Sequence, residues 1–160
     1  MKAKIDQERR AALKSGGAMT IFGLFVAAGL VRPAAAQATW NDKAFAAKGV
    51  DNVVKSLGGA SAAQTRDVTW GTTPEIAENG AVVPISVTSN IAGTQSIAIL
   101  VEKNPNTLAA SFEIPAGTDA SVSTRVKIGE SSNVYALIKA DNKYFVAARE
   151  IKVTLGGCGG

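Results

Sequence analysis

Residues 133–154 read NVYALIKADNKYFVAAREIKVT, two strand-like runs separated by the turn-forming pair at 141–142. In the first run Val134, Ala136 and Ile138 occupy every second position. Side chains of a β-strand alternate between its two faces, so these three can point together into a core. The pair of runs predicts an antiparallel hairpin.

Similar runs rich in β-branched residues occur upstream, from residue 67 onward. They are DVTW, VVPISVT, QSIAILVEK, LAASFEI and VSTRVKI, separated by turn-forming residues such as Asn79-Gly80 and Asn104-Pro105-Asn106. The whole pattern predicts about seven strands and no second long helix that could connect parallel strands. We therefore expect a mainly β protein, an antiparallel β-sandwich of the immunoglobulin type.

One amphipathic helix is predicted before the strands, over residues 41–57. Val50, Val53, Val54 and Leu57 have the spacing that lines one face of a helix, and Gly58-Gly59 follows as a stop signal. We expect this face to pack on the strand domain. The tryptophans at 40 and 70 are expected to be packing anchors.

The first 38 residues have the layout of a signal peptide: a charged start, an uncharged stretch over 15–31, and Ala-rich cleavage sites after Ala36 and Ala38. The uncharged stretch is shorter than the roughly 20 apolar residues of a membrane-spanning helix. Arg9-Arg10 resembles the twin-arginine export motif, although Glu8 and Ala12 depart from its usual residues. We expect export to the periplasm, and no membrane span in the mature chain.

The composition excludes several classes of function. The chain has no histidine and one cysteine, so it cannot hold a Ser-His-Asp triad or a zinc site made of histidines or paired cysteines. Its net charge of +4 arises within residues 1–38, which hold six basic and two acidic residues, while the remainder is neutral. A neutral body gives no reason to expect nucleic acid as a partner. No catalytic residue, metal site or cofactor is predicted in this chain.

The single cysteine, Cys158, lies in the last five residues, between Gly156-Gly157 and Gly159-Gly160. Glycine loses the most conformational entropy on ordering, so we expect this segment to be a flexible, exposed arm. Five extended residues reach roughly 17 Å. The predicted organisation is therefore a signal peptide (1–38), a helix and β-sandwich domain (39–155), and an arm (156–160) that carries a covalent cargo on Cys158 between partner enzymes.

The ordered set of segments resembles the SoxY family, the sulfur carrier subunits of periplasmic thiosulfate-oxidising Sox systems. The segments are PEIAENGAVVPISV (74–87), IAILVEKNPN (97–106), LAASFEIPAGTDASVSTRVKIGESSNVYALIKAD (108–141) and AAREIKVTLGGCGG (147–160). Thr107 departs from the pattern, where proline is expected.

The resemblance implies that Cys158 binds thiosulfate-derived sulfur and that the chain forms a heterodimer with SoxZ. It further implies transient contacts with SoxAX, which joins thiosulfate to the cysteine, with SoxB, which releases sulfate, and with SoxCD where it is present.

Two other functions fit part of the sequence. A terminal Gly-Gly also marks ubiquitin-like sulfur donors, which carry sulfur on the last carboxylate and work in the cytoplasm. An exported β-sandwich that only binds another protein could use its cysteine for an intermolecular disulfide. Replacing Cys158 with Ser separates the first alternative from a thiol carrier, and the mass of the Cys158 peptide separates the second.

Overall fold

The computed structural model describes residues 41–155, which form two short helices and two β-sheets. The predicted signal peptide (1–38), Trp40 and the predicted arm (156–160) lie outside the described residues. The helices are α2 (Asp42–Ala46) and α3 (Val50–Ser56), and the strands are β1 (Ala62–Gln64), β2 (Val68–Trp70), β3 (Ile76–Asn79), β4 (Val83–Ser89), β5 (Thr94–Val101), β6 (Leu108–Glu113), β7 (Ser121–Val126), β8 (Ser132–Ala140) and β9 (Lys143–Leu155).

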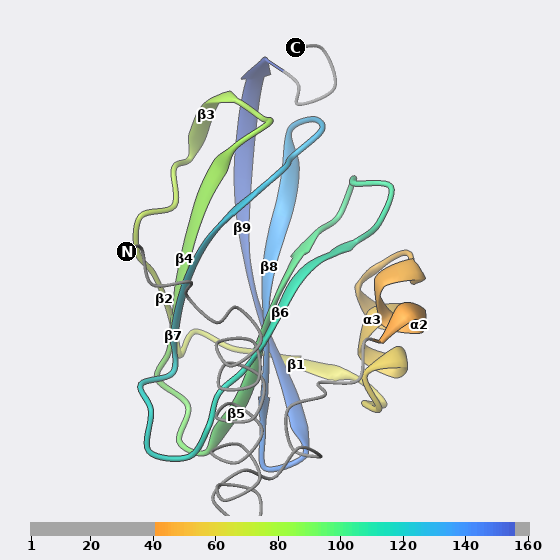
Figure 1. Ribbon diagram of the computed structural model, residues 1–160, viewed down its shortest axis with the longest axis vertical. Helices are drawn as coiled ribbons and strands as arrows, with labels where there is room; N and C mark the ends of the chain where they lie inside the picture. Colours follow the sequence, from red (N-terminus) through yellow and green to blue (C-terminus); the bar gives the residue numbers. More distant parts are fainter. Residues whose placement is uncertain (1–40, 156–160) are drawn as a thin grey trace, which may run out of the picture. The chain divides into compact units, whose positions relative to one another are not determined.

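The larger sheet has the strand order β1-β9-β8-β5-β6, with β3 also pairing with β9, and the smaller sheet has the order β2-β4-β7 (Figure 1). All pairs are antiparallel except β1 with β9 and β3 with β9, which are parallel. In an immunoglobulin constant domain of seven strands, the fourth strand belongs to the same sheet as the first, second and fifth. When the seven predicted strands are counted in chain order, the fourth is β6, and it pairs instead with the third, β5, in the larger sheet. The strand order therefore differs from that of an immunoglobulin constant domain.

The prediction of a mainly β, two-sheet protein is confirmed, and all seven predicted strands are present. Two further strands, β1 and β3, were not predicted. Both are short, with three and four residues, and both pair in parallel with β9, far along the chain. Their sequences, AAQ and IAEN, hold a single β-branched residue between them, so they lack the strand signal that the equally short VTW of β2 carries.

The predicted hairpin joins β8 to β9 through Asp141 and Asn142. Both residues have positive φ angles, 46° and 59°, as a two-residue turn of type I′ requires. Asp and Asn tolerate this conformation better than most residues other than glycine. The pairing then runs from Ala140↔Lys143 to Ser132↔Ile151.

The main core lies between the two sheets. It is built from alternate residues of the strands, which is why the period-two pattern identified them. Its fully buried members include Ile85 and Val87 of the smaller sheet and Ile97, Ile99 and Ile138 of the larger. Trp70 is partly buried and packs against this core, as expected for a packing anchor.

A second core lies on the outer face of the larger sheet, under the helices (Figure 1). Val53 and Val54 of α3 pack there with residues such as Leu100 and Leu137. As a result, β5 and β8 are buried on both faces along much of their length. The expected packing of the Val/Leu helix face on the strand domain is confirmed.

The prediction of one helix over 41–57 is wrong, because the segment forms two helices. The first helix ends at Ala47, whose ψ of 137° is extended, and the break continues to Gly49, whose φ of 82° is incompatible with a right-handed helix. The Gly49 amide donates instead to Oγ1 of Thr107 at 2.8 Å, a buried hydroxyl between β5 and β6. Thr107 is the residue that departs from the resemblance pattern, and here it fastens the start of α3 to the sheet.

The end of α3 is fastened by Tyr144 at the start of β9. The Tyr144 hydroxyl donates to the Leu57 carbonyl at 2.6 Å, and the ring is buried. The ring also fills the space over Gly59, where an added Cβ would lie 2.5 Å from Tyr144 Cδ2. Gly59 is therefore required at this point by close approach of an aromatic ring.

Candidate functional site

The candidate site begins where the described chain ends, at Leu155, the last residue of β9. Cys158 and its glycine neighbours Gly156, Gly157, Gly159 and Gly160 lie outside the described residues. What the structure describes is the root from which they extend: the last four residues of β9, at the end of the sheet away from the β8–β9 turn (Figure 1).

The root extends beyond the pairing between β8 and β9, which ends at Ile151. From Lys152 to Leu155 the neighbour of β9 is instead β3, in parallel register, with Ile76 opposite Lys152 and Asn79 opposite Leu155. One of the two strands that were not predicted, β3, therefore holds the root. Its sequence, Ile76 to Asn79, contains one β-branched residue and ends in the Asn79-Gly80 turn, so it carries little strand signal.

Hydrogen bonds hold the root along its length. The Lys152 amide donates to the Glu75 carbonyl at 2.9 Å, and the Gly80 amide donates to the Leu155 carbonyl at 2.8 Å. The Thr154 hydroxyl donates to the Glu78 carbonyl at 3.1 Å. The chain is thus fixed in position up to Leu155 by partners in and around β3.

The other edge of the root is held by Ser131, which precedes β8. The Val153 amide donates to Oγ of Ser131 at 2.9 Å, and the side chain is half-buried. This hydroxyl replaces the missing β8 neighbour at one position, so the root is supported on both edges.

The charges near the root are of both signs. Arg149 and Glu75 form an ion pair with 3.5 Å between Arg149 Nη2 and Glu75 Oε1. The Glu75 side chain is largely exposed, so the pair adds little stability. In the part of the chain that the structure describes, no group of three or more Cys, Asp or Glu side chains could hold a metal ion.

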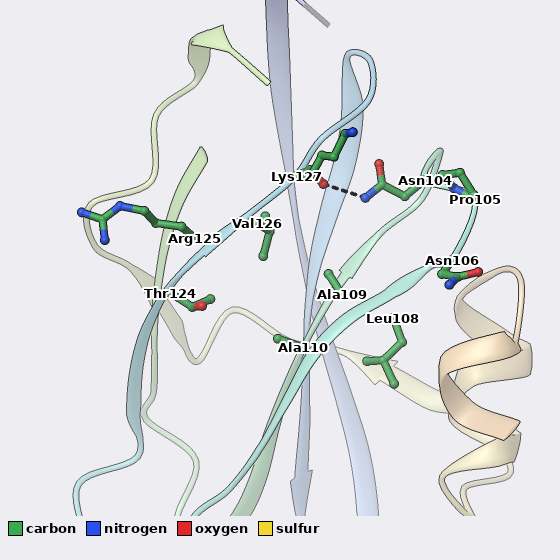
Figure 2. Close-up of a pocket in the computed structure, with 10 residues that line it drawn as sticks. All are labelled: Asn104, Pro105, Asn106, Leu108, Ala109, Ala110, Thr124, Arg125, Val126 and Lys127. Atoms are coloured by element: carbon green, nitrogen blue, oxygen red, sulfur yellow. Dashed lines mark hydrogen bonds between the residues drawn. The ribbon is translucent and has the colours of Figure 1, made fainter. Parts of the chain in front are cut away.

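A separate groove of about 420 Å³ lies between the edge strands β6 and β7. Figure 2 shows its lining, which is Asn104, Pro105, Asn106, Leu108, Ala109, Ala110, Thr124, Arg125, Val126 and Lys127. The Asn104 side chain closes one end, because its amide nitrogen donates to the Lys127 carbonyl at 2.7 Å and its oxygen accepts from the Gly129 amide at 3.1 Å. The lining has no carboxylate, thiol or imidazole and so presents no acid–base pair.

Comparison with known proteins identifies the family. The profile of the sulfur oxidation protein SoxY matches residues 54–158, which includes the cysteine. No curated protein sequence matches the chain.

Among solved structures, the sulfur carrier protein SoxY from Chlorobium limicola f thiosulfatophilum is 31% identical, with a TM-score of 0.59, covering 66% of this chain and 94% of its own. A superoxide reductase (neelaredoxin) from Ignicoccus hospitalis is 18% identical, with a TM-score of 0.46, covering 54% of this chain and 78% of its own. Within residues 41–155, neither helix has the length and apolar content needed to cross a membrane.

Proposed function

The chain belongs to the SoxY family of sulfur oxidation proteins, and from this premise we propose that the thiol of Cys158 is the group to which thiosulfate-derived sulfur is attached. The family match runs through residue 158, and Cys158 is the single cysteine of the chain. It stands three residues beyond a root that β3 and Ser131 hold in place. The observation that carries the proposal is this placement of the one thiol directly after a fixed strand end.

In the proposed cycle the Cys158 thiolate joins the outer sulfur of thiosulfate. A sulfur–sulfur bond forms, and two electrons leave to a haem enzyme of the SoxAX type, so the product is a cysteine S-thiosulfonate. Water then attacks the terminal sulfonate in an enzyme of the SoxB type, releasing sulfate and two protons and leaving a persulfide on Cys158. Where SoxCD is present, it accepts six electrons from this sulfane sulfur while three waters supply the oxygen atoms and release six protons, which leaves a cysteine S-sulfonate. A further hydrolysis by the SoxB-type enzyme then releases a second sulfate and restores the thiol.

The carrier contributes the sulfur atom and its reach, while the partner enzymes contribute metals and bases. Within residues 41–155 the side chains around the root form one exposed ion pair and no metal-binding group. We propose that the chain has no catalytic turnover of its own and acts as a heterodimer with SoxZ. We further propose that residues 1–38 direct it, through the twin-arginine route, to the periplasm.

The test is intact mass spectrometry of the assembled carrier after incubation with thiosulfate and the conjugating haem enzyme. We expect a thiosulfonate adduct on the peptide that contains Cys158, and its conversion to a persulfide after the hydrolase is added. Cys158→Ser should abolish the adduct. Gly159→Ser is the matched control, because it adds a hydroxyl to the same segment and keeps the thiol.

Two results contradict this function. One is an unmodified Cys158 peptide in the wild-type carrier after complete incubation. The other is a constant, partner-linked disulfide at Cys158, which is the result expected of an exported interaction protein. Sulfur on the terminal carboxylate of the Cys158→Ser variant would indicate the ubiquitin-like scheme.

A further inference from the structure

Strand β7 forms a free edge of the smaller sheet, whose strand order is β2-β4-β7. Its pairing with β4 is continuous over six residue pairs, from Thr88↔Ser121 to Val83↔Val126. The strand contains no proline and no bulge, two of the devices that prevent foreign strands from pairing with a sheet edge. An edge of this kind is open to a strand from another chain.

The backbone groups of β7 point alternately toward β4 and toward the free edge, as in any antiparallel pair. The Ser89 amide donates to the Ala120 carbonyl at 2.8 Å, so this pair and every second pair after it are the hydrogen-bonded ones. The amides and carbonyls of Ser123 and Arg125 therefore point away from β4. No hydrogen bond joins them to any other part of residues 41–155.

One end of this edge is already occupied by a side chain that bonds as a neighbouring strand would. The Asn104 carboxamide donates to the Lys127 carbonyl at 2.7 Å and accepts from the Gly129 amide at 3.1 Å. The amide and carbonyl groups of an added strand would form bonds of the same kind. The free groups at 123 and 125 lie directly before these bonded ones.

A strand added to β7 would close the groove between β6 and β7 (Figure 2). Because side chains of a strand alternate between its faces, every second one would point into this groove. The walls there include the half-buried side chains of Ala109 and Ala110 from β6 and Thr124 from β7. These side chains are small and leave about 420 Å³ open, so aliphatic side chains would be buried on entering it.

The other side chains of an added strand would lie on the outer face, beside Arg125 and Lys127. Both are exposed and alternate with the buried Val126 and Ile128, and Figure 2 shows Arg125 pointing away from β6. Neither basic side chain has an ion-pair partner among the residues that the structure describes. Opposite charges on neighbouring strands attract, so acidic residues fit these positions.

The charge of β7 argues against a second copy of this chain as the occupant. The edge from 121 to 127 has two basic residues and no acidic one, so two paired copies would bring like charges together. The exposed side chains of the strand are those of Ser121, Ser123 and Arg125. Such a polar surface is typical of transient interfaces, since obligate interfaces are more hydrophobic.

We propose that β7 is a docking edge for a transient protein partner, which adds an extended segment to it as a fourth strand of the smaller sheet. The segment has aliphatic residues at alternate positions, facing the groove, and Asp or Glu between them, facing Arg125 and Lys127. This inference does not depend on the proposed sulfur-carrier function.

The probe is the peptide Glu-Val-Glu-Val-Glu-Val with blocked ends, added to the complete chain, both alone and assembled with its heterodimer partner. Amide hydrogen exchange, measured by NMR, reports the new backbone bonds. With the peptide at about ten times its Kd, roughly one chain in eleven is free, so the amides of Ser123 and Arg125 should exchange about tenfold more slowly. The Val122 amide faces β4 and is already protected, so its exchange shows that β4 and β7 remain paired.

Two variants test the backbone and the charge separately. Ser123→Pro removes an amide that faces the free edge, where proline is tolerated, and should abolish the protection of Arg125. Arg125→Glu should raise the Kd of the peptide by about five- to tenfold, because an attractive pair becomes a repulsive one. The control is Lys55→Glu, the same charge change at an exposed position of α3, which should leave the Kd unchanged.

Several results would overturn the docking edge. One is unchanged exchange at Ser123 and Arg125 with saturating peptide, and another is equal binding of a peptide with lysine in place of glutamate. Protection that grows with protein concentration would indicate a second copy, and protection already present in the heterodimer would indicate a permanent partner.

Inorganic anions are tested with sodium sulfate. If sulfate produces the same chemical-shift changes as the peptide, and the peptide protects no amide, the basic side chains bind small anions only and the docking edge is wrong. None of these results changes the adduct at Cys158, which mass spectrometry tests separately.

Discussion

Replacing Tyr144 with Phe tests whether one buried phenol fastens the helices to the larger sheet. The hydroxyl donates to the Leu57 carbonyl at 2.6 Å, and Tyr144 is 6% exposed. Phe keeps the ring over Gly59 and removes only the hydroxyl. The free energy of unfolding should fall by about 0.5–1.5 kcal/mol for the lost hydrogen bond, and by up to about 3 kcal/mol if the Leu57 carbonyl finds no other donor.

The same substitution should change how stability depends on pH. Burial, and then the negative charge of Glu113, raises the pKa of Tyr144 above its ordinary value of about 10. The folded state thus keeps the Tyr144 proton at a pH where the unfolded chain loses it. This contribution to stability is complete below about pH 10 and is lost as pH rises through the folded-state pKa. Tyr144→Phe should therefore lose less stability than the wild type between pH 9 and 11, roughly the range of tyrosine titration.

Urea unfolding at neutral and alkaline pH measures both effects, with Tyr135→Phe as the control. The Tyr135 hydroxyl donates to Oε2 of Glu102 at 3.3 Å in an exposed position, so its loss should change stability less. Burial, followed by the charge of Glu102, also raises the pKa of Tyr135. Because the chain has two tyrosines, each variant leaves one to be titrated by its ultraviolet absorbance. A Tyr144→Phe variant within about 0.3 kcal/mol of the wild type, close to the error of such comparisons, or a Tyr144 that titrates below its ordinary pKa, would refute the reasoning.

Two further substitutions test close packing and a buried hydroxyl. Gly59→Ala should destabilise by about 1–3 kcal/mol in thermal or urea unfolding, since the new Cβ would lie 2.5 Å from Tyr144 Cδ2 and 2.7 Å from Val54 Cγ1; unchanged stability would mean that the ring moves freely. Thr73→Val should destabilise by a similar 1–3 kcal/mol or so, because the buried Thr73 hydroxyl donates to the Ser86 carbonyl at 3.2 Å and accepts from its amide at 3.0 Å. Hydrogen exchange at the Ser86 amide should accelerate in that variant, and unaltered exchange would contradict the assignment.

The strands that could be predicted from sequence are those whose signal is local. The runs that form β4 and β8 alternate over seven and nine residues, and Asp141-Asn142 supplies the backbone that the hairpin requires. The β8 pattern also shows a limit, since Leu137 occupies the face opposite Ile138 and is nonetheless buried, under the helices. Alternation identified the strand, but which of its faces would be covered depended on the tertiary structure.

The predictions that failed, or were not made, depended on long-range contacts. The helix predicted over 41–57 has the correct apolar spacing, yet it is interrupted between Ala47 and Gly49, where the Gly49 amide donates to Thr107, 58 residues away. Likewise β3 exists because β9 offers it a partner edge. Cys158 could be proposed from its position between two glycine pairs, whereas the part that β3 plays in holding the end of β9 could be recognised only from the structure.

On the proposed function, the position of β3 also limits how far a cargo on Cys158 could travel, because its reach is measured from the last residue that the sheet holds. If β9 were held only as far as its pairing with β8, at Ile151, seven residues would separate Cys158 from the sheet and would span up to about 23–25 Å. With β3 holding the chain to Leu155, three residues remain and span about 10–11 Å. The accessible volume falls roughly tenfold, and the concentration of cargo at a docked enzyme rises in proportion. If Cys158 carries sulfur as proposed, the short strand 76–79 thus sets how far from the sheet that sulfur can reach.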